Sequence, residues 1–256
     1  MLAIEPIPAF VDNYIWCVHN GVDACVVDPG DATPAIEFLE AHKLKLRAIL
    51  ITHHHPDHIG GIATLRDLYA LDTVYGPDNP RISGITQVVR EGDEIEVLGE
   101  RFRVLEVPGH TLDHIAYAST EMQPPALFCG DTLFAAGCGR LFEGTPAQMF
   151  NSLNKFKKLP PETRIFCTHE YTQANLRFAR AVEPDNLALK QRAQSADNVR
   201  ANHQPTLPST LALELETNPF LRTWQPGVQN AALQHGSQST DEADIFAAIR
   251  RWKDQF

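Results

Sequence analysis

Cysteine is scarce in this sequence, and the few cysteines are not arranged as a disulfide framework or a cysteine-rich metal site. Five cysteines occur in 256 residues, and none forms a Cys-x-x-Cys pair. They lie at positions 17, 25, 129, 138 and 167. An odd number without paired spacing indicates reduced, mostly buried thiols, as expected for a protein of a reducing compartment.

Long apolar runs and an excess of positive charge are also lacking. No stretch approaches the roughly 18–20 apolar residues of a membrane-spanning helix. The first 16 residues contain no Lys or Arg and are interrupted by Glu5, Pro6, Pro8 and Asp12, so no signal peptide is predicted. Lys and Arg total 22 against 32 Asp and Glu, a net charge of −10, which argues against nucleic-acid binding. We therefore expect a soluble, cytoplasmic monomer that binds neither nucleic acid nor a membrane.

Histidine, in contrast, is concentrated in one place. Four of the 11 histidines fall within six positions, namely His53, His54, His55 and His58. They follow Ala48–Ile51, a short apolar run typical of a strand. In extended backbone, side chains two apart point the same way, so His53 and His55 face together and His54 faces away. Pro56 favours extended backbone at His55.

The same loop offers more ligands than one ion needs. After Pro56 the chain turns into a helix, and Gly60-Gly61 permits close backbone packing that brings Asp57 and His58 to the same cavity. Because a tetrahedral ion seldom draws four ligands from one loop, two adjacent ions are predicted.

Three further candidates follow apolar strands, where α/β sheets commonly place ligand sites. These are His110 after Phe102–Val107, Asp131 after Ala126–Cys129, and His169 after Ile165–Cys167. Five histidines and two aspartates suffice for two ions if one aspartate bridges. Such ligands suit zinc, iron or manganese, and the residues do not choose among them.

A structural role is the alternative for any single histidine. We expect it for the remaining five, of which His114 could lie behind the ligands: His19, His42, His114, His203 and His235. A tag-like run would be contiguous and terminal, whereas this one is internal and interrupted by Pro56 and Asp57. A metal-storage protein without enzymatic activity remains a possible reading of the ligand cluster alone.

The chain changes character near residue 170. Short predicted strands, with helices at Pro34–His42 and Ile62–Leu71, give way to helical patterns at Tyr171–Glu183, Leu187–Asn202 and Thr240 to about Asp254. Pro184-Asp185-Asn186 supplies a stop and a cap, and Ser239 with Glu242 has capping-box spacing. We predict an α/β domain over residues 1–169 and a helical domain over residues 170–256.

The ligand motif resembles that of the metallo-β-lactamase superfamily. Over its full length the sequence is similar to the hydroxyacylglutathione hydrolases (glyoxalase II), and four segments carry this likeness: Gly137–Gly144, Thr168–Thr172, Asn218–Phe220 and Arg250–Phe256. The resemblance implies an α/β fold, a metallo-β-lactamase-like αββα sandwich with a C-terminal helical domain.

The resemblance also assigns the ligands. One metal would be held by His53, His55 and His110. The other would be held by Asp57, His58 and His169, with Asp131 bridging the two. The family's cofactor would be two divalent ions per chain, zinc being expected and iron or manganese being the alternatives.

The implied reaction is hydrolysis of an S-2-hydroxyacylglutathione, such as S-D-lactoylglutathione, in the second step of methylglyoxal detoxification. A hydroxide bridging the metals would be the nucleophile, and Asp57 would accept the proton of the bridging water. Substrate binding maps onto five positions, namely Arg140, Phe142, Tyr171, Arg250 and Lys253.

Two of these positions depart from the family. Members often carry Lys and Tyr where this chain has Arg140 and Phe142, so a charge is kept and a hydroxyl is lost. Arg250 and Lys253 are three apart and share a helix face, which suits carboxylate capture. A solvated charged face is the alternative.

Other enzymes on this metal platform are less consistent with the sequence. A β-lactamase would normally be exported, and a nuclease would need a basic groove. A glutathione persulfide dioxygenase uses a single iron, against which seven candidate ligands and a long helical C-terminus argue.

Overall fold

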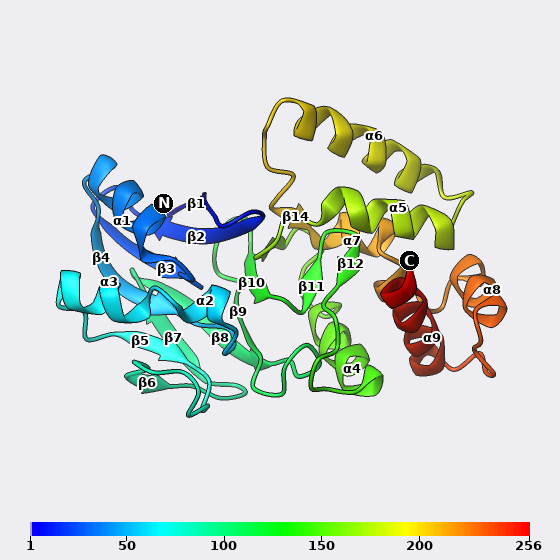
Figure 1. Cartoon of the computed structure of the whole chain (residues 1–256), viewed down its shortest axis with the longest axis horizontal. Helices are drawn as coiled ribbons and strands as arrows, with labels where there is room; N and C mark the ends of the chain where they lie inside the picture. Colours follow the sequence, from blue (N-terminus) through cyan, green and yellow to red (C-terminus); the bar gives the residue numbers. More distant parts are fainter. Residues whose placement is uncertain (1) are drawn as a thin grey trace. The chain divides into compact units, whose positions relative to one another are not determined.

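A computed structural model describes residues 2–256. The chain forms two compact units (Figure 1). The first comprises the residues up to Glu106 together with Asp113–Gly130, and the second comprises Val107–Leu112 together with Asp131–Phe256. Within the described residues, every helix is too short or too polar to span a lipid bilayer.

A six-stranded sheet forms one layer of the first unit, in the order β1-β2-β3-β4-β5-β6. Its strands are β1 (Ala3–Ala9), β2 (Asn13–His19), β3 (Asp23–Val27), β4 (Lys45–Leu50), β5 (Val74–Gly76) and β6 (Gln87–Val88). Strands β1 to β3 are antiparallel, whereas β3 and β4 are parallel, with Val27 opposite Leu50. The segments that follow β3 and β4 therefore leave the sheet side by side.

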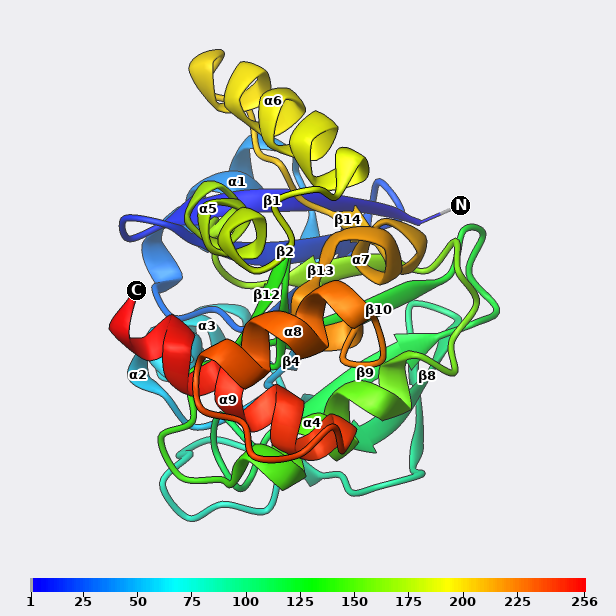
Figure 2. The same ribbon diagram turned by 90° about the vertical axis from the view of Figure 1, so that its right-hand side faces the viewer.

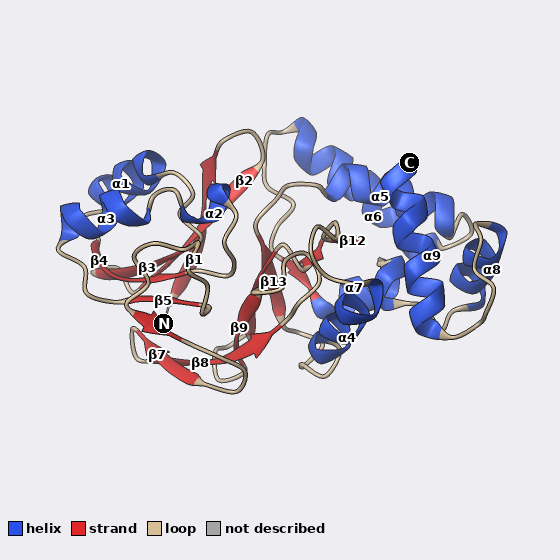
Figure 3. Cartoon of the chain, turned by 60° about the horizontal axis from the view of Figure 1, so that its bottom comes forward, coloured by secondary structure: helices blue, strands red, loops and turns tan. Residues whose placement is uncertain are grey.

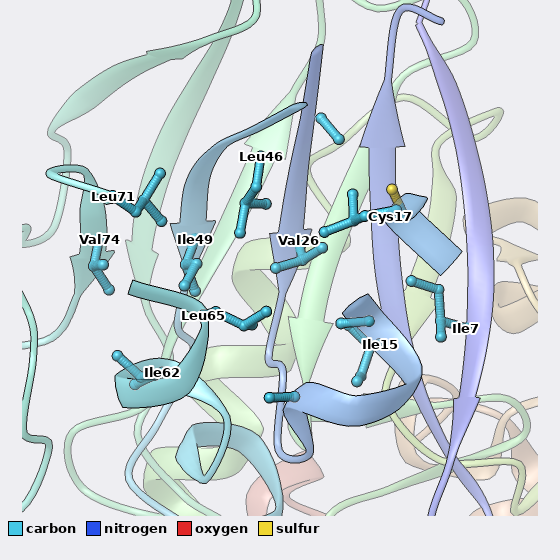
Figure 4. Close-up of a cluster of buried hydrophobic side chains, with 14 of the residues drawn as sticks. Ile7, Ile15, Cys17, Val26, Leu46, Ile49, Ile62, Leu65, Leu71 and Val74 are labelled. Atoms are coloured by element: carbon cyan, nitrogen blue, oxygen red, sulfur yellow. The ribbon is translucent and has the colours of Figure 1, made fainter. Parts of the chain in front are cut away.

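Helices cover one face of this sheet and close its core. α1 (Ala32–Ala41) begins at Asp31, whose side chain accepts a hydrogen bond from Thr33 N, and α3 (Ile62–Tyr69) follows the short helix α2 (Pro56–Ile59). Figure 4 shows Leu65 of α3 among side chains of the strands. Each such buried aliphatic side chain stabilises the fold by roughly 1.5–3 kcal/mol.

Four antiparallel strands of a second sheet also lie in the first unit. They are β7 (Glu94–Val97), β8 (Glu100–Glu106), β9 (Ile115–Ser119) and β10 (Ala126–Gly130). β9 is buried throughout, as expected for a strand covered on both faces. The Tyr117 hydroxyl donates to the Ile51 carbonyl (2.9 Å), and Ile115 N donates to the Thr52 carbonyl (2.9 Å). These bonds tie the second sheet to the segment that follows β4.

The second unit is mainly helical, as Figure 3 shows. Its strands are β11 (Leu133–Phe134), β12 (Gly137–Cys138), β13 (Arg164–Cys167) and β14 (Ser209–Thr210). Its helices are α4 (Pro146–Phe156), α5 (Thr172–Val182), α6 (Leu187–Ala201), α7 (Leu211–Thr217), the 3-10 turn η1 (Pro219–Leu221), α8 (Pro226–Gln234) and α9 (Glu242–Gln255). Figure 2 shows α8 lying alongside α9, and the two helices are in contact.

The predicted elements are present, with corrections at their ends. The last helix begins at Glu242 and is capped by Asp241, whose carboxylate accepts from Ala243 N (2.9 Å). The expected capping box of Ser239 and Glu242 is therefore wrong, because Asp241 occupies the cap position. A capping box does occur at Thr145, at the start of α4, where none was predicted.

Candidate functional site

The histidine loop follows β4, and its ligand atoms converge. His53 Nε2 lies 3.1 Å from His55 Nδ1, and His58 Nε2 lies 3.7 Å from the Oδ2 atom of Asp57. The His53 and His58 rings are 4.0 Å apart between centroids. Two nitrogens bound to one tetrahedral ion at metal–nitrogen distances of 2.0–2.1 Å are separated by about 3.3 Å. The loop thus presents its donor atoms at separations suited to metal ligation.

The side chain between these ligands points elsewhere, as predicted. His54 Nδ1 is 2.8 Å from the Asp113 carboxylate, which also accepts from Asn79 Nδ2 (2.7 Å). Both His54 and Asp113 are largely buried. The alternation expected of extended backbone therefore separates His54 from His53 and His55.

A buried aspartate that sequence reasoning missed orients two of the candidate ligands. Asp28 is 2% exposed, and its Oδ1 accepts from Thr52 N (2.8 Å). Its Oδ2 accepts from the Thr52 hydroxyl (2.7 Å) and from His58 Nδ1 (3.0 Å). Because the Thr52 proton goes to Asp28, the Thr52 oxygen accepts from His53 Nδ1 (3.0 Å). These contacts favour the Nδ1-protonated tautomer of both rings, which leaves Nε2 available to coordinate a metal.

The rule that found the other ligands could also have found Asp28. It follows β3 directly, whereas His53 lies three residues after the end of β4, and the parallel register of the two strands places the two segments together. Asp28 has a φ of 51°, a left-handed conformation in which Asp is among the few tolerated residues.

Close backbone packing at Gly60 positions Asp57 and His58, as predicted for the Gly60-Gly61 pair. A Cβ atom at Gly60 would lie 2.4 Å from the Gly30 carbonyl oxygen, a distance that no side chain accommodates. α2 can therefore lie directly against the segment after β3, which places Asp57 and His58 beside Asp28. Asn13 Nδ2 donates to Asp57 Oδ2 (3.0 Å) and fixes that carboxylate.

The second unit contains the three predicted strand-end ligands, gathered around one carboxylate oxygen. Asp131 Oδ2 lies 3.4 Å from His110 Nε2 and 3.3 Å from His169 Nε2. All three side chains are less than 10% exposed. One oxygen flanked by two imidazole nitrogens at ligand–ligand separations is the arrangement required of a bridging carboxylate.

Backbone contacts fix this second set. His110 Nδ1 donates to the Arg140 carbonyl (2.7 Å), which again leaves Nε2 available to coordinate a metal. A Cβ at Gly139 would lie 2.0 Å from the Asp131 carbonyl oxygen, so only glycine permits this loop to pass so close to the aspartate. Gly139 N donates to the Thr132 carbonyl (3.2 Å) and closes the loop.

Aromatic side chains stand beside two ligands of the second unit. The Tyr171 ring is parallel to that of His169, with centroids 4.7 Å apart, and Phe134 meets Tyr171 edge-on at 5.3 Å. The Phe142 ring meets His110 at 5.2 Å and is 61% exposed. Tyr171 and Phe142, two of the five positions predicted for substrate contact, therefore adjoin candidate metal ligands.

Arg250 and Lys253 do not form a solvated charged face. Arg250 is 4% exposed, and it donates to the Cys138 carbonyl (3.0 Å) and to Asp254 Oδ1 (3.0 Å). Arg140 Nε lies 3.5 Å from the same Asp254 oxygen. The structure therefore gathers Arg140 and Arg250 around one carboxylate, and sequence reasoning had not identified Asp254.

Lys253 is also held inside the second unit. Its ammonium donates to Asn175 Oδ1 and lies 5.3 Å from the centroid of the Phe178 ring. Burial, reinforced by the neighbouring Arg250 guanidinium, lowers the pKa of Lys253 to about 8. Lys253 therefore loses its positive charge as the pH rises through about 8.

Four of the five remaining histidines have protein partners, in agreement with structural roles. The His114 ring stacks on that of His53, with centroids 4.5 Å apart, and so lies beside a candidate ligand. His19 contacts Glu5, His42 contacts the Phe38 carbonyl, and His235 contacts the Ala231 carbonyl. His203 is exposed at the end of α6.

Comparison with known proteins places the chain among metal-dependent hydrolases. Residues 10–169 match the metallo-β-lactamase superfamily, and residues 170–256 match the hydroxyacylglutathione hydrolase C-terminus. A hydroxyacylglutathione hydrolase of Cupriavidus taiwanensis is 54% identical over 265 residues, which cover the whole of both chains.

Solved structures share the fold. The B3 metallo-β-lactamase BLEG-1 is 23% identical with a TM-score of 0.65, over 86% of this chain and 100% of its own. A protein solved in a di-iron-bound form, TTHA1623, is 26% identical with a TM-score of 0.62, over 85% of this chain and 100% of its own.

Proposed function

The chain belongs to the hydroxyacylglutathione hydrolases of the metallo-β-lactamase superfamily, and we propose on this premise that its substrate is an S-2-hydroxyacylglutathione such as S-D-lactoylglutathione. Hydrolysis of the thioester yields glutathione and a 2-hydroxy acid, the second step of methylglyoxal detoxification. The observation that carries this proposal is the 54% identity to a hydroxyacylglutathione hydrolase along the entire chain.

Seven side chains are proposed to hold two divalent ions. His53, His55 and His110 form one ligand set, Asp57, His58 and His169 form the other, and Asp131 bridges. The superfamily match over residues 10–169 includes all seven positions, which supports this assignment. Divalent ions held by such a set would lower the pKa of coordinated water to about 7 and would polarise the substrate carbonyl.

Zinc is the proposed metal. Imidazole and carboxylate donors suit zinc, and they also suit iron and manganese. TTHA1623, a structural relative, holds two irons, which keeps iron as the principal alternative.

The chain's own residues prepare the site for the reaction. Asp28 and the Arg140 carbonyl keep three histidines in the coordinating tautomer. Asn13 holds one oxygen of Asp57, and we assign to this carboxylate the acceptance of the proton released by the attacking water. Arg140, Arg250 and Lys253 are proposed to attract the carboxylates of glutathione. Tyr171 and Phe142 are proposed to flank the thioester.

The organisation of the protein follows from the same premise. We propose a metal hydrolase domain over residues 1–169 and a helical substrate-binding domain over residues 170–256, in line with the two family matches. Five free, buried cysteines suit the proposed cytoplasmic location. A monomer is proposed, to be checked by analytical ultracentrifugation.

Release of free thiol from S-D-lactoylglutathione, measured together with the metal content of the purified protein, tests the function. We expect turnover with about two ions per chain. Absence of thiol release from protein that carries two ions would contradict the proposed substrate, and turnover without metal would contradict the proposed site.

The lowered pKa of Lys253 predicts a pH-dependent KM. As the pH rises through about 8, Lys253 loses the charge that attracts the substrate carboxylate, so KM should rise while kcat changes less. Steady-state kinetics between pH 6.5 and 9.5 measure this effect. Lys253→Arg, whose charge persists at these pH values, should flatten the profile. If the dependence of KM on pH is the same in Lys253→Arg as in the wild type, the charge of Lys253 plays no part in substrate binding.

Restoring the hydroxyl lost at position 142 should strengthen substrate binding. Phe142→Tyr adds a hydrogen-bonding group to an exposed ring, so stability should change little. One new hydrogen bond contributes about 0.5–1.5 kcal/mol, which corresponds to a roughly 2- to 13-fold lower KM. Kinetics with S-D-lactoylglutathione measure it, and Phe10→Tyr, at another exposed ring, serves as the control.

A further inference from the structure

Glu214, on α7, is a fully buried carboxylate surrounded by donors. It is 0% exposed. Its Oε1 accepts from Arg192 Nη2 (2.5 Å) and from the Ser209 hydroxyl. Its Oε2 accepts from the backbone N–H of Ala136 (2.8 Å) and from Asn218 Nδ2 (3.0 Å). One oxygen therefore contacts the helical region, and the other holds the turn between β11 and β12.

Two asparagines hold the same turn. Asn218 Nδ2 also donates to the carbonyls of Gly137 (2.9 Å) and Phe134 (3.2 Å). Asn175 Nδ2 donates to the carbonyl of Ala135 (3.0 Å). We call Glu214, Asn218 and Asn175 the turn clamp. Each residue from Phe134 to Gly137 thus has a backbone group bonded to a clamp side chain.

The turn needs such support because its backbone is unfavourable. Leu133 pairs with Cys138 and Phe134 with Gly137, so only Ala135 and Ala136 form the loop. Ala136 has a φ of 56°, a left-handed conformation that a Cβ atom disfavours. Glycine or asparagine would be usual there, and two-residue hairpins normally use such residues.

The position of this turn matters for the ligands on either side of it. Asp131 precedes β11 by two residues, and Arg140 follows β12 by two residues. The carbonyl of Arg140 accepts the Nδ1 proton of His110, and Gly139 is bonded back to Thr132. A displaced turn would therefore move both the bridging carboxylate and the group that orients His110.

We propose that the turn clamp is a positioning device for the metal ligands, through which the helical domain sets the geometry of Asp131 and His110. This inference rests on the proposed ligand roles of those two residues. The alternative is that Glu214 only joins the helices of the second unit through Arg192.

A rescue experiment separates the two roles. Glu214→Gln removes the charge and one acceptor, whereas Ala136→Gly removes the cost of the left-handed backbone without touching the clamp. Ala136→Gly alone should change kcat by less than about twofold, because relief of strain offsets the loss of one buried methyl. The double variant, which carries both Glu214→Gln and Ala136→Gly, then tests whether Glu214 acts through the turn.

Glu214→Gln should lower metal affinity about 10- to 100-fold, the effect typical of losing support for a metal ligand. It should lower kcat, whereas KM should change less. Chelator competition measures the affinity, and the visible spectrum of the cobalt-substituted protein reports ligand geometry independently of activity. The double variant should regain at least tenfold in affinity and recover the wild-type spectrum. A double variant as impaired as Glu214→Gln, or Glu214→Gln with wild-type affinity, would overturn the proposal.

A second variant covers the case in which Glu214→Gln fails to fold. Asn218→Ser loses the amide donor but keeps an oxygen near Phe220 N, which Asn218 caps in the native chain, and it leaves the Arg192–Glu214 ion pair intact. It should show the same rescue by Ala136→Gly, and failure of that rescue in a folded protein overturns the proposal. Thioester hydrolysis by the wild-type chain tests the proposed function separately, so the two hypotheses fail in different measurements.

Discussion

Asp131→Ala is expected to reduce both metal content and turnover more than any other single change. Its Oδ2 lies within 3.4 Å of both His110 Nε2 and His169 Nε2, so one substitution removes the donor shared by both proposed ligand sets. Loss of a supporting residue already costs 10–100-fold in affinity or activity, and loss of a ligand should exceed this. We expect fewer than two ions per chain and kcat lower by more than roughly 10²-fold.

His54→Ala is the control, because it lies within the densest histidine cluster yet its side chain is turned to Asp113. It should keep two ions and most of its turnover, with some loss of thermal stability. Elemental analysis and thiol-release kinetics on both variants decide the matter. Two tightly bound ions and a normal rate in Asp131→Ala would show that this aspartate does not bridge.

The candidate ligands could be predicted because their positions depend on local rules. The alternation of side chains along extended backbone distinguished His53 and His55 from His54. Position after the end of a strand identified the other three candidates, which are His110, Asp131 and His169. These rules need only the strand pattern, which is strong where β-branched and apolar residues are bounded by Gly or Pro. The resemblance to a known family then supplied the substrate, which the strand pattern alone could not.

Contacts between distant segments were beyond such rules. The N-terminal hairpin was missed because Pro6 and Pro8 indicate a break, whereas β1 is an edge strand and tolerates proline. The β11–β12 hairpin has two-residue strands and an Ala-Ala turn with no sequence signal. Glu214, which holds this turn, lies 78 residues from Ala136 in the chain.

The sequence also did not show which charged side chains are buried. Arg250 belongs to a run of basic residues that suggests a solvated face, yet its partners are the Cys138 carbonyl and Asp254. The Cys138 carbonyl lies 112 residues away in the chain. Asp28 is the exception, because the strand-end rule would have found it if applied to β3.

Asp28→Asn is expected to have the second largest effect, through the protonation of the ligands rather than their position. Asn tolerates the left-handed backbone at this site, so the fold around β3 should persist. The amide has only one acceptor oxygen, so it cannot accept from Thr52 N at one position and from the Thr52 hydroxyl and His58 Nδ1 at the other, as the carboxylate does now. If the amide NH₂ faces His58, Nδ1 must become the acceptor and the ring proton moves to Nε2, where it opposes coordination.

The predicted result is a 10- to 100-fold loss of metal affinity, with turnover largely recovered at saturating metal because every ligand is still present. Chelator competition and a titration of kcat with added zinc measure both parts. Asp31→Asn is the matched control, since Asp31 caps α1 three residues away and Asn caps equally well. Wild-type affinity in Asp28→Asn would mean that the Asp28 charge is not what holds His58 in its coordinating tautomer. A loss that excess metal fails to restore would instead mean that Asp28 positions the histidine loop, because a misplaced ligand cannot be compensated by mass action.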